Sequence, residues 1–428
     1  MGETVVNARA DDARFLAGFD LRALPPAFYE NPYPFYHALR RHDPVRRMPD
    51  HSYFLTRHDD VVAVYRDPRR FSSDKKDEFR PKYRATPLYE HHTTSRVFND
   101  PPLHTRVRRL IAGALTARVI AEMEDGIERL VATLLDRAAE RREIDLIEDF
   151  AALIPVEVIG NLLAVPHDER GPLRGWSLAI LGALEPAPDA AMLARGNRAV
   201  EAFLAYLRDL IAARRVRPGD PARDILTRLI QGEQGGGEQG GGEQAGGEAD
   251  GARLDERELL HNCIFLLNAG HETTTNLIGN ALHALSEFRG ERERLRADPT
   301  LMASAIEEFL RFESSNQLGN RRALAACEIG GVAIPEGALI TLGIGAANRD
   351  PAQFPDPDRL DLARTPNRHV AFGFGIHQCA GLAVARLEAR IAIARFLERF
   401  PRYDLSAAPI RGGRARFRGF LSLPVTLT

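Results

Sequence analysis

The longest helical pattern of the chain, from about Asp255 to Phe288, constrains the fold most strongly. Apolar residues dominate its first half, and Asp255 followed three residues later by Glu258 is the pattern of a capping box at a helix start. A helix of about 33 residues is roughly 50 Å long at 1.5 Å per residue, which is enough to cross a whole domain. We therefore expect one central, buried helix around which the shorter helices pack.

The middle of this helix carries an unusual polar run, Ala269-Gly270-His271-Glu272-Thr273-Thr274. Glycine weakens a helix and a threonine hydroxyl can bond a carbonyl of the preceding turn, so the run predicts a local opening near Gly270. Thr273 could simply satisfy its own helix, whereas a buried Glu272 needs a partner. Because local inconsistency often marks function, Glu272 and Thr273 are candidate catalytic residues.

A glycine-rich loop close to the C-terminus contains one of only three cysteines, in the stretch Phe372-Gly373-Phe374-Gly375-Ile376-His377-Gln378-Cys379-Ala380-Gly381. An apolar helical pattern follows at once, and a helix start stabilises a thiolate. The glycines lack a Cβ, so the loop can lie close to a flat ligand. These residues predict a reactive or metal-bound cysteine beneath something large and planar, and leave redox, zinc and catalytic roles open.

Two further helical patterns carry charged pairs. Asp100-Pro101-Pro102 predicts a helix start with an acidic cap, and His104 and Arg108 then share one face of that helix. This face is either solvated or a clamp for an anionic group. Glu308 and Arg311 lie three residues apart on a later helix, a spacing that suits an ion pair and is also common on surfaces; Glu307 would serve equally by spacing.

Composition excludes several classes of protein. The 428 residues are 44% hydrophobic and 27% charged with a net charge of −2, which argues against nucleic-acid binding. There is no apolar run that could span a bilayer and no signal peptide, which predicts no membrane association. Three scattered cysteines indicate a reducing compartment, so a cytoplasmic location is expected.

The domain organisation predicted from the sequence is simple. Residues 1–20 form a flexible lead-in, with Asp12 contributing nothing to a core, and residues 21–428 form one domain. A Gly/Glu-rich segment, 231–251, predicts a disordered surface loop. The pair His91-His92 is interpreted as part of a solvated loop and not as a metal site.

Taken together, these motifs resemble the cytochrome P-450 superfamily. The loop around Cys379 resembles its haem-binding loop, the run from Ala269 to Thr274 resembles its oxygen-activating motif, and Glu308-Phe309-Leu310-Arg311 resembles its Glu-x-x-Arg signature. Arg359 falls where the family's coil supplies a third charged member. The motifs follow in the family's order, and the likeness extends from about residue 20 to the C-terminus.

The resemblance implies a mainly α fold with small β-sheets (α+β), a triangular prism of helices with haem b (iron protoporphyrin IX) between the long helix and the helix after the cysteine loop. Cys379 would be the axial ligand of the haem iron. Glu272 and Thr273 would relay protons for dioxygen activation. The remaining haem contacts would be His104, Arg108, Ala269, Gly270, Arg321, Phe372, Gly373, His377 and Gly381. Glu308, Arg311 and Arg359 would form a buried structural network.

The same resemblance implies a monooxygenase that inserts one atom of O2 into a small, mostly apolar organic substrate. No reductase domain follows the cysteine region and no anchor precedes the domain, so we expect electrons from a separate ferredoxin or flavodoxin with its NAD(P)H reductase. The electron donor is expected to dock on the cysteine side through Arg106, Arg109, Arg386 and Arg390. A peroxide-driven peroxygenase and a non-enzymatic haem sensor are the alternatives, and neither needs the Glu272-Thr273 pair.

The substrate pocket implied by the resemblance is lined by five segments: 75–97, part of 173–200, 266–269, 314–320 and 417–421. Three asparagines in or beside these segments are polar where aliphatic residues are common. They would either bind a polar atom of the substrate or satisfy backbone groups; they are Asn268, Asn316 and Asn320.

Overall fold

The computed structural model describes residues 12–234 and 254–428, and within these the chain is mainly helical with small sheets, as the resemblance implies. The first 11 residues and most of the predicted disordered loop, 231–251, lie outside the described residues. In the described ranges no helix is long and apolar enough to cross a bilayer.

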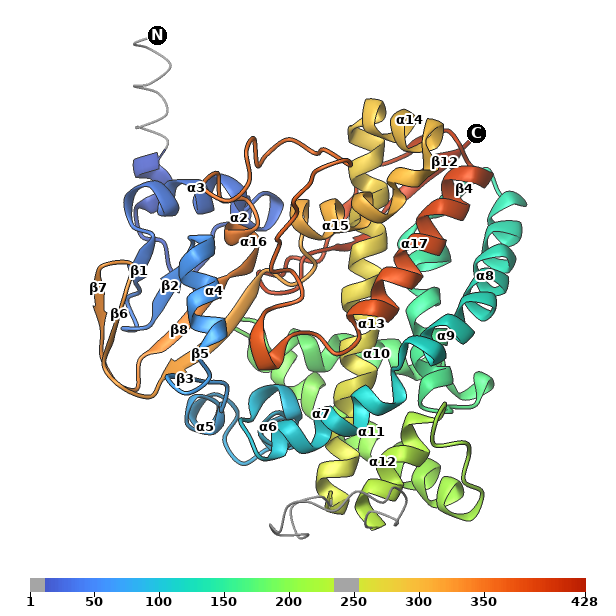
Figure 1. Cartoon of the computed structure of the whole chain (residues 1–428), viewed down its shortest axis with the longest axis horizontal. Helices are drawn as coiled ribbons and strands as arrows, with labels where there is room; N and C mark the ends of the chain where they lie inside the picture. Colours follow the sequence, from blue (N-terminus) through green and yellow to red (C-terminus); the bar gives the residue numbers. More distant parts are fainter. Residues whose placement is uncertain (1–11, 235–253) are drawn as a thin grey trace, which may run out of the picture.

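The α-helices that carry labels in Figure 1 have the bounds α2 Pro26–Glu30, α3 Tyr33–His42, α4 His58–Arg66, α5 Lys76–Tyr83, α6 Pro87–Thr94, α7 Leu103–Ala114, α8 Ala117–Ala139, α9 Leu153–Leu162, α10 Gly171–Gly182, α11 Ala190–Val216, α12 Ile225–Gln234, α13 Glu256–Glu287, α14 Arg289–Ala297, α15 Met302–Phe312, α16 Ile344–Ala347 and α17 Leu382–Arg399. In Figure 1 α13 runs through the middle of the helical part, with α17 and α8 on one side.

The strands form four small sheets. A five-stranded sheet has the order β1-β2-β8-β5-β3 and lies at one side of the molecule, away from α8, α9 and α11 (Figure 1). A three-stranded sheet has the order β4-β12-β9, and β6-β7 and β10-β11 are hairpins. The bounds are β1 Val45–Arg47, β2 Tyr53–Leu55, β3 Phe71–Ser72, β4 Glu143–Asp145, β5 Leu318–Ala323, β6 Cys327–Ile329, β7 Val332–Ile334, β8 Leu339–Gly343, β9 Tyr403–Leu405, β10 Ile410–Arg411, β11 Phe420–Ser422 and β12 Pro424–Leu427.

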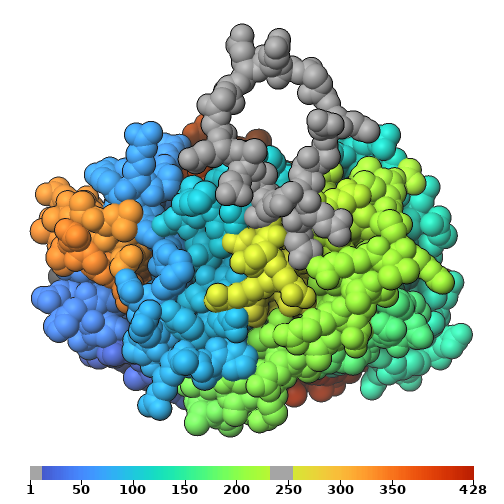
Figure 2. Space-filling view, turned by 90° about the horizontal axis from the view of Figure 1, so that it is seen from below, coloured from blue at the N-terminus to red at the C-terminus, as the bar shows by residue number. Residues whose placement is uncertain are grey.

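The central helix begins as the sequence predicts. A carboxylate oxygen of Asp255 accepts a hydrogen bond from the backbone N–H of Glu258 at 2.6 Å, and the Glu258 side chain accepts one from the backbone N–H of Asp255 at 3.1 Å. This capping box satisfies two donors that would otherwise be free at the helix start. Figure 2 shows this end of α13, in yellow, reaching the surface between the blue segment around α5 and α6 and the yellow-green α11 and α12. The helix then runs for 32 residues through the main hydrophobic core.

The N-terminal segment differs from the predicted lead-in. Asp12 is buried and accepts hydrogen bonds from Arg41 and His42 of α3. The ring of Phe15 lies 4.6 Å from that of Phe35, centroid to centroid. Residues 12–20 therefore belong to the packed domain, because they cover the aromatic residues of α3.

Two other local predictions are wrong. The helix α7 starts at Leu103 without a side-chain cap, because the carboxylate of Asp100 instead accepts from the backbone N–H of Ser73 at 2.9 Å and ties the loop to the end of β3. His91 and His92 do not lie in a solvated loop; they are on α6, and only 2% and 1% of their surfaces are exposed.

Candidate active site

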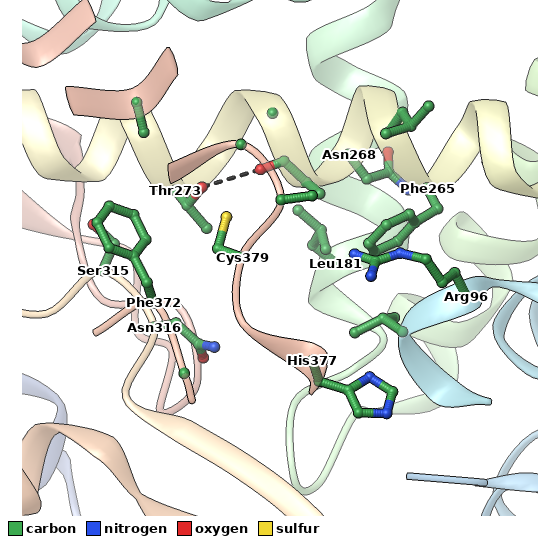
Figure 3. A pocket seen from close by; sticks show the side chains of 18 of the residues that line it. Arg96, Leu181, Phe265, Asn268, Thr273, Ser315, Asn316, Phe372, His377 and Cys379 are labelled. Atoms are coloured by element: carbon green, nitrogen blue, oxygen red, sulfur yellow. Dashed lines mark hydrogen bonds between the residues drawn. The ribbon is translucent and has the colours of Figure 1, made fainter. Parts of the chain in front are cut away.

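A cavity of about 340 Å³ lies between α13 and the cysteine loop, and its lining is mostly apolar (Figure 3). All five segments that the sequence analysis assigns to a pocket contribute to it, with His92, Leu181, Asn268, Asn316 and Phe417 as one example from each. The sulfur of Cys379 and the side chain of Thr273 face each other across this space (Figure 3). The cavity therefore joins the two motifs that are more than 100 residues apart in sequence.

The cysteine loop is held by its own backbone and by glycines with positive φ. The N–H of Cys379 donates to the carbonyl of Phe372 at 2.9 Å. Gly373 and Gly375 have φ of 66° and 72°, which disfavours any side chain, and a Cβ at Gly375 would lie 2.4 Å from the backbone oxygen of Tyr65 in α4. The loop can therefore pack against α4 only with glycine at this position.

The thiol of Cys379 is half-buried next to several cations. Burial raises its pKa, while the backbone N–H of Gly381 and the guanidinium groups of Arg96 and Arg108 favour the thiolate. The same arginine, Arg108, donates from Nη1 to the carbonyl of Gln378 at 2.6 Å, so α7 is attached directly to the loop. A negative charge on sulfur would be stabilised by these groups.

Of the four cationic or donor residues expected to hold an anionic group, two line the cavity and two lie behind its lining. Arg321 and His377 line the cavity. His104 and Arg108 are outside the lining, and His104 stacks on His377 with ring centroids 4.1 Å apart. Burial and the nearby Arg321 hold the pKa of His377 far below its usual range, so its ring is neutral.

Arg96 is a further cation that the sequence analysis missed. It is buried, it lines the cavity, and its Nη1 lies 3.3 Å from Nε2 of His104. Its only signal in the sequence was a cation inside the otherwise weakly polar stretch Ser95-Arg96-Val97-Phe98. Within the described part of the chain, Nε of Arg96, Nδ1 of His104 and both ring nitrogens of His377 are buried without a hydrogen-bond partner.

The polar run of α13 does not interrupt the helix. The Thr273 hydroxyl donates to the carbonyl of Ala269 at 3.1 Å, and the backbone stays helical through Gly270 (Figure 3). The opening predicted at Gly270 is thus not seen. A Cβ on Gly270 would lie 3.0 Å from Cδ1 of Ile159, so this glycine also allows α9 to pack closely on α13.

Glu272 points away from the cavity that holds Cys379. It borders a second, small cleft together with Asn276, and it forms an ion pair with Arg414 from the segment between β10 and β11. Burial raises the pKa of Glu272 to about 7, against the opposing effect of Arg414. Oε2 of Glu272 has no hydrogen-bond partner among the described residues. The carboxyl can therefore change protonation near neutral pH.

The Glu-x-x-Arg pair is fully buried. Nε and Nη2 of Arg311 each donate to the carboxylate of Glu308 at 2.8 Å, and neither side chain is exposed (0% each). The third charged side chain is Arg364, whose Nε lies 3.2 Å from Glu308, and not Arg359. Arg359 is exposed and contributes its backbone carbonyl, which accepts from Arg311 at 3.2 Å. The prediction of Arg359 as a charged member is wrong, because the coil turns its side chain outward.

This network supports the chain that leads into the cysteine loop. Arg311 also donates to the carbonyl of Asn348 at 2.9 Å, and the Asn348 side chain accepts from the N–H of Val370 at 2.8 Å, two residues before Phe372. Glu307 has a separate role, since it pairs with Arg386 of α17 at 2.7 Å. The spacing alone could not distinguish Glu307 from Glu308. The structure distinguishes them because Glu308 is fully buried and Glu307 is only partly buried.

Three of the four arginines expected to contact an electron donor already have partners. Arg106 pairs with Glu258, Arg386 with Glu307 at 2.7 Å, and Arg390 with Glu124 at 2.6 Å. Arg109 of α7 is exposed, and no ion pair is found for it among the described residues.

The three asparagines differ in what they offer a ligand. Oδ1 of Asn268 accepts from Ser177 at 2.8 Å, and Nδ2 of Asn320 donates to the Thr341 hydroxyl at 3.1 Å. Asn316 lines the cavity, and its buried Oδ1 has no partner in the described ranges.

These residues fit the haem that the sequence resemblance implies. A half-buried thiol in the cavity is available for the iron, glycines leave space for a flat ring, and the unpartnered donors of Arg96, His104 and His377 match the two carboxylates of the porphyrin. Buried donors without partners are costly, so a bound anionic group accounts for their presence.

Comparison with known proteins agrees with this geometry. The family model for cytochrome P450 matches residues 189–405. Cytochrome P450 107B1 of Saccharopolyspora erythraea is 39% identical over 421 residues, which cover 95% of this chain and 97% of the relative. The vitamin D(3) 25-hydroxylase of Pseudonocardia autotrophica is 38% identical over 411 residues, covering 94% of each chain.

Solved structures show the same similarity. The crystal structure of P450BioI in complex with an acyl carrier protein ligated to hexadec-9Z-enoic acid superposes with a TM-score of 0.85 at 33% identity, covering 94% of this chain and 100% of that one. The family match, the relatives and the shared fold all support the same conclusion. The chain belongs to the cytochrome P450 family and is a monooxygenase with haem b as its cofactor.

Proposed function

We propose that this enzyme hydroxylates a small, mostly apolar organic substrate, or oxidises it in a related way, with electrons from a separate ferredoxin or flavodoxin and its NAD(P)H reductase in the cytoplasm. One observation carries the proposal: the Cys379 thiol and the Thr273 side chain both line one apolar cavity and face each other in it (Figure 3). An apolar cavity of this kind selects an apolar substrate and excludes bulk water.

In this proposal Cys379 would bind the haem iron through its sulfur, and Arg108, Arg96 and Gly381 favour its thiolate form. The haem, when bound, supplies the oxidising chemistry by which one atom of O2 enters the substrate. His377 and Arg321 would hold the haem carboxylates, with His104 stacked behind His377. Ala269, Gly270, Phe372 and Gly373, with Gly381, form the lining against the ring.

The proton path uses two neighbouring residues on different sides of α13. Glu272 takes a proton at its carboxylate from the cleft beside Arg414, and Thr273 delivers a proton from its hydroxyl on the cavity side. A pKa of about 7 suits Glu272 to both accept and give a proton near neutral pH. Because the two side chains point apart, Glu272 must turn or use a water to reach Thr273.

The substrate class is supported by the relatives as well as by the cavity. One relative is a vitamin D(3) 25-hydroxylase, and a solved neighbour holds a fatty acyl group on a carrier protein. Both compounds are long and largely apolar, which agrees with the mostly apolar lining here. Asn316, with its free Oδ1, is the asparagine best placed to bind a polar substrate atom.

The test begins with the reduced protein under carbon monoxide, where the haem-thiolate spectrum should appear in the wild type and be lost in Cys379→Ser. A Thr273→Ala variant should keep this spectrum but release most of the consumed O2 as hydrogen peroxide. The matched control is Thr275→Ala, because Thr275 makes the same bond to the preceding turn, to His271 at 3.1 Å, outside the cavity. Strong turnover with hydrogen peroxide that is unaffected by Thr273→Ala would instead favour the peroxide-driven alternative.

A further inference from the structure

Three cations gather at the end of the cavity bordered by α5, β5 and the turn after α10. Lys75 and Arg416 line the cavity. Nζ of Lys75 lies 2.7 Å from the carboxylate of Glu78, and Nζ of Lys82 donates to the backbone carbonyl of Glu185 at 2.8 Å. Burial, and then the charge of Arg416, lower the pKa of Lys82 to about 8, which agrees with their proximity.

The guanidinium of Arg416 is fixed in place by neutral acceptors. Nε donates to the carbonyl of Leu184 at 3.2 Å, Nη1 to that of Leu318 at 2.8 Å, and Nη2 to Oδ1 of Asn320 at 2.5 Å. A guanidinium has five N–H groups, so donors remain free. Over residues 12–234 and 254–428 no carboxylate forms an ion pair with it.

The carboxylates nearby do not balance the cluster. Glu78 is taken by Lys75, and the Glu185 carboxylate accepts from the backbone N–H of Arg416 at 3.1 Å. The Arg416 guanidinium is therefore a positive charge beside an apolar cavity that has no ion-pair partner among the described residues. A buried or half-buried charge is costly unless an opposite charge pairs with it.

The Arg416 guanidinium lies near Arg321, one of the cations assigned to the haem, but the two guanidinium groups have different partners. Arg321 lies over the ring of Tyr65, 4.9 Å from its centroid, and Tyr65 is in contact with Gly375 of the cysteine loop. Arg416 bonds to Leu318 and Asn320 of β5, the strand that carries Arg321, and also to the turn after α10 through Leu184. The contact with Leu184 is what distinguishes the position of Arg416 from that of Arg321.

We propose that the substrate carries a carboxylate, bound by Arg416 with Lys75 beside it, and that its apolar part extends along the cavity toward Cys379. This inference rests on the proposed function, because it names the substrate class of the same cavity. An arginine held by neutral acceptors is preorganised for a carboxylate, which it can bind with two parallel hydrogen bonds. A neutral ligand of the same shape would leave the charge unpaired and bind less well.

The experiment compares dodecanoic acid with methyl dodecanoate by spin-state titration of the haem-loaded enzyme at constant ionic strength. We expect the acid to bind at least about tenfold more tightly than the ester, the range of one charge-assisted hydrogen bond. Arg416→Gln should remove this preference by weakening the acid alone, and Arg416→Lys should keep part of it. The control is Arg80→Gln, because Arg80 is an exposed cation of α5 outside the cavity.

Several results would overturn the inference. One is an acid that binds no more tightly than its ester in the wild type, including the case where neither shifts the spin state. Others are an acid preference that persists in Arg416→Gln, or loss of haem from both Arg416 variants, which would assign Arg416 to the porphyrin carboxylates. Failure of the proposed function is distinguishable, since it would appear earlier as a missing haem-thiolate spectrum in the wild type.

Discussion

At the scale of single residues, the environment of Glu272 explains its chemistry. Its pKa rises from the usual 4.5 to about 7, since the cost of burying its charge exceeds the attraction of Arg414. In the folded enzyme this carboxyl therefore holds a proton up to about pH 7, while in the unfolded chain it loses the proton near pH 4.5. Its contribution to stability accordingly falls as the pH rises between these two values. The proton on Glu272 remains available for transfer up to near-neutral pH.

The first prediction concerns the pH dependence of coupling, measured as product formed per NAD(P)H oxidised. We expect coupling to decline as the pH rises through about 7, because the protonated fraction of Glu272 falls there. Glu272→Gln should lower kcat about 10²-fold, a typical contribution of a proton donor, and its pH profile should be flat in this range. The measurement is a series of steady-state assays from pH 6 to pH 8 with a fixed electron donor.

Glu388 of α17 provides the matched control. It is also buried, it borders the cavity, and burial raises its pKa well above the usual value. Glu388→Gln should leave the pH profile of coupling like that of the wild type. If Glu388→Gln flattened the profile and Glu272→Gln did not, the proton would enter from α17 and the role given to Glu272 would be wrong.

At the scale of elements, α15 and the coil after α16 fix the position of the cysteine loop. The bidentate pair of Glu308 and Arg311 joins α15 to that coil through the carbonyls of Asn348 and Pro357 at 2.9 Å and 2.8 Å. The buried pair is not strong evidence of stability by itself, because desolvation offsets much of its attraction. Removing one partner of the pair is nevertheless strongly destabilising, because the other charge then stays buried without a partner.

We predict that Glu308→Ala lowers the free energy of unfolding by about 3–5 kcal/mol and reduces haem retention, the usual effect of breaking a buried ion pair. Urea unfolding and the haem-to-protein ratio would measure this. The control is Arg395→Ala, which breaks pairs with Glu128 and Glu398 while the Arg395 side chain is 48% exposed, and which should cost about 1 kcal/mol or less. Equal losses in both variants would contradict the structural role.

The same network distinguishes Arg364 from Arg359. Arg364→Ala removes a charged donor to Glu308 and should destabilise the enzyme by about 1–3 kcal/mol, the cost of leaving a buried charge with one partner fewer. Arg359→Ala keeps the backbone carbonyl that Arg311 uses, so its unfolding midpoint should remain within error of the wild type. A larger effect at Arg359 would restore the assignment made from sequence.

At the scale of the whole molecule, most of the basic residues on the cysteine side form ion pairs between helices of the same chain. Arg106, Arg386 and Arg390 connect α7 with α13, α17 with α15, and α17 with α8. Charge reversal at these positions would break these ion pairs as well as any contact with an electron donor. Arg109, exposed on the helix that also holds the cysteine loop through Arg108, is the cleaner position for contact with an electron donor.

We therefore predict that Arg109→Glu slows the reduction by an acidic ferredoxin about tenfold at low salt, since a rim charge acts mainly on the association rate. The difference should shrink as the salt concentration rises, because exposed charges are screened. Stopped-flow reduction under carbon monoxide measures the rate, and Arg80→Glu on α5 is the control for net charge. A rate unchanged by Arg109→Glu at low salt would remove this face from the docking surface.

The family, the central helix with its Asp255-Glu258 cap and the loop around Cys379 could all be predicted from the sequence. These features depend on residues that are close in the chain, where glycines, caps and helical spacing act locally. The order of the motifs then implied the cofactor and the reaction class.

Contacts between residues that are far apart in the sequence became known from the folded chain. The tertiary structure brought Arg414 to Glu272 and Arg364 to Glu308, turned Arg359 outward, and buried His92 of the supposedly solvated pair. These outcomes depend on how helices and coils pack over long sequence separations, which no local spacing encodes. For the same reason the charge of Arg416 beside the cavity, and with it the proposed carboxylate substrate, could be found only in the folded chain.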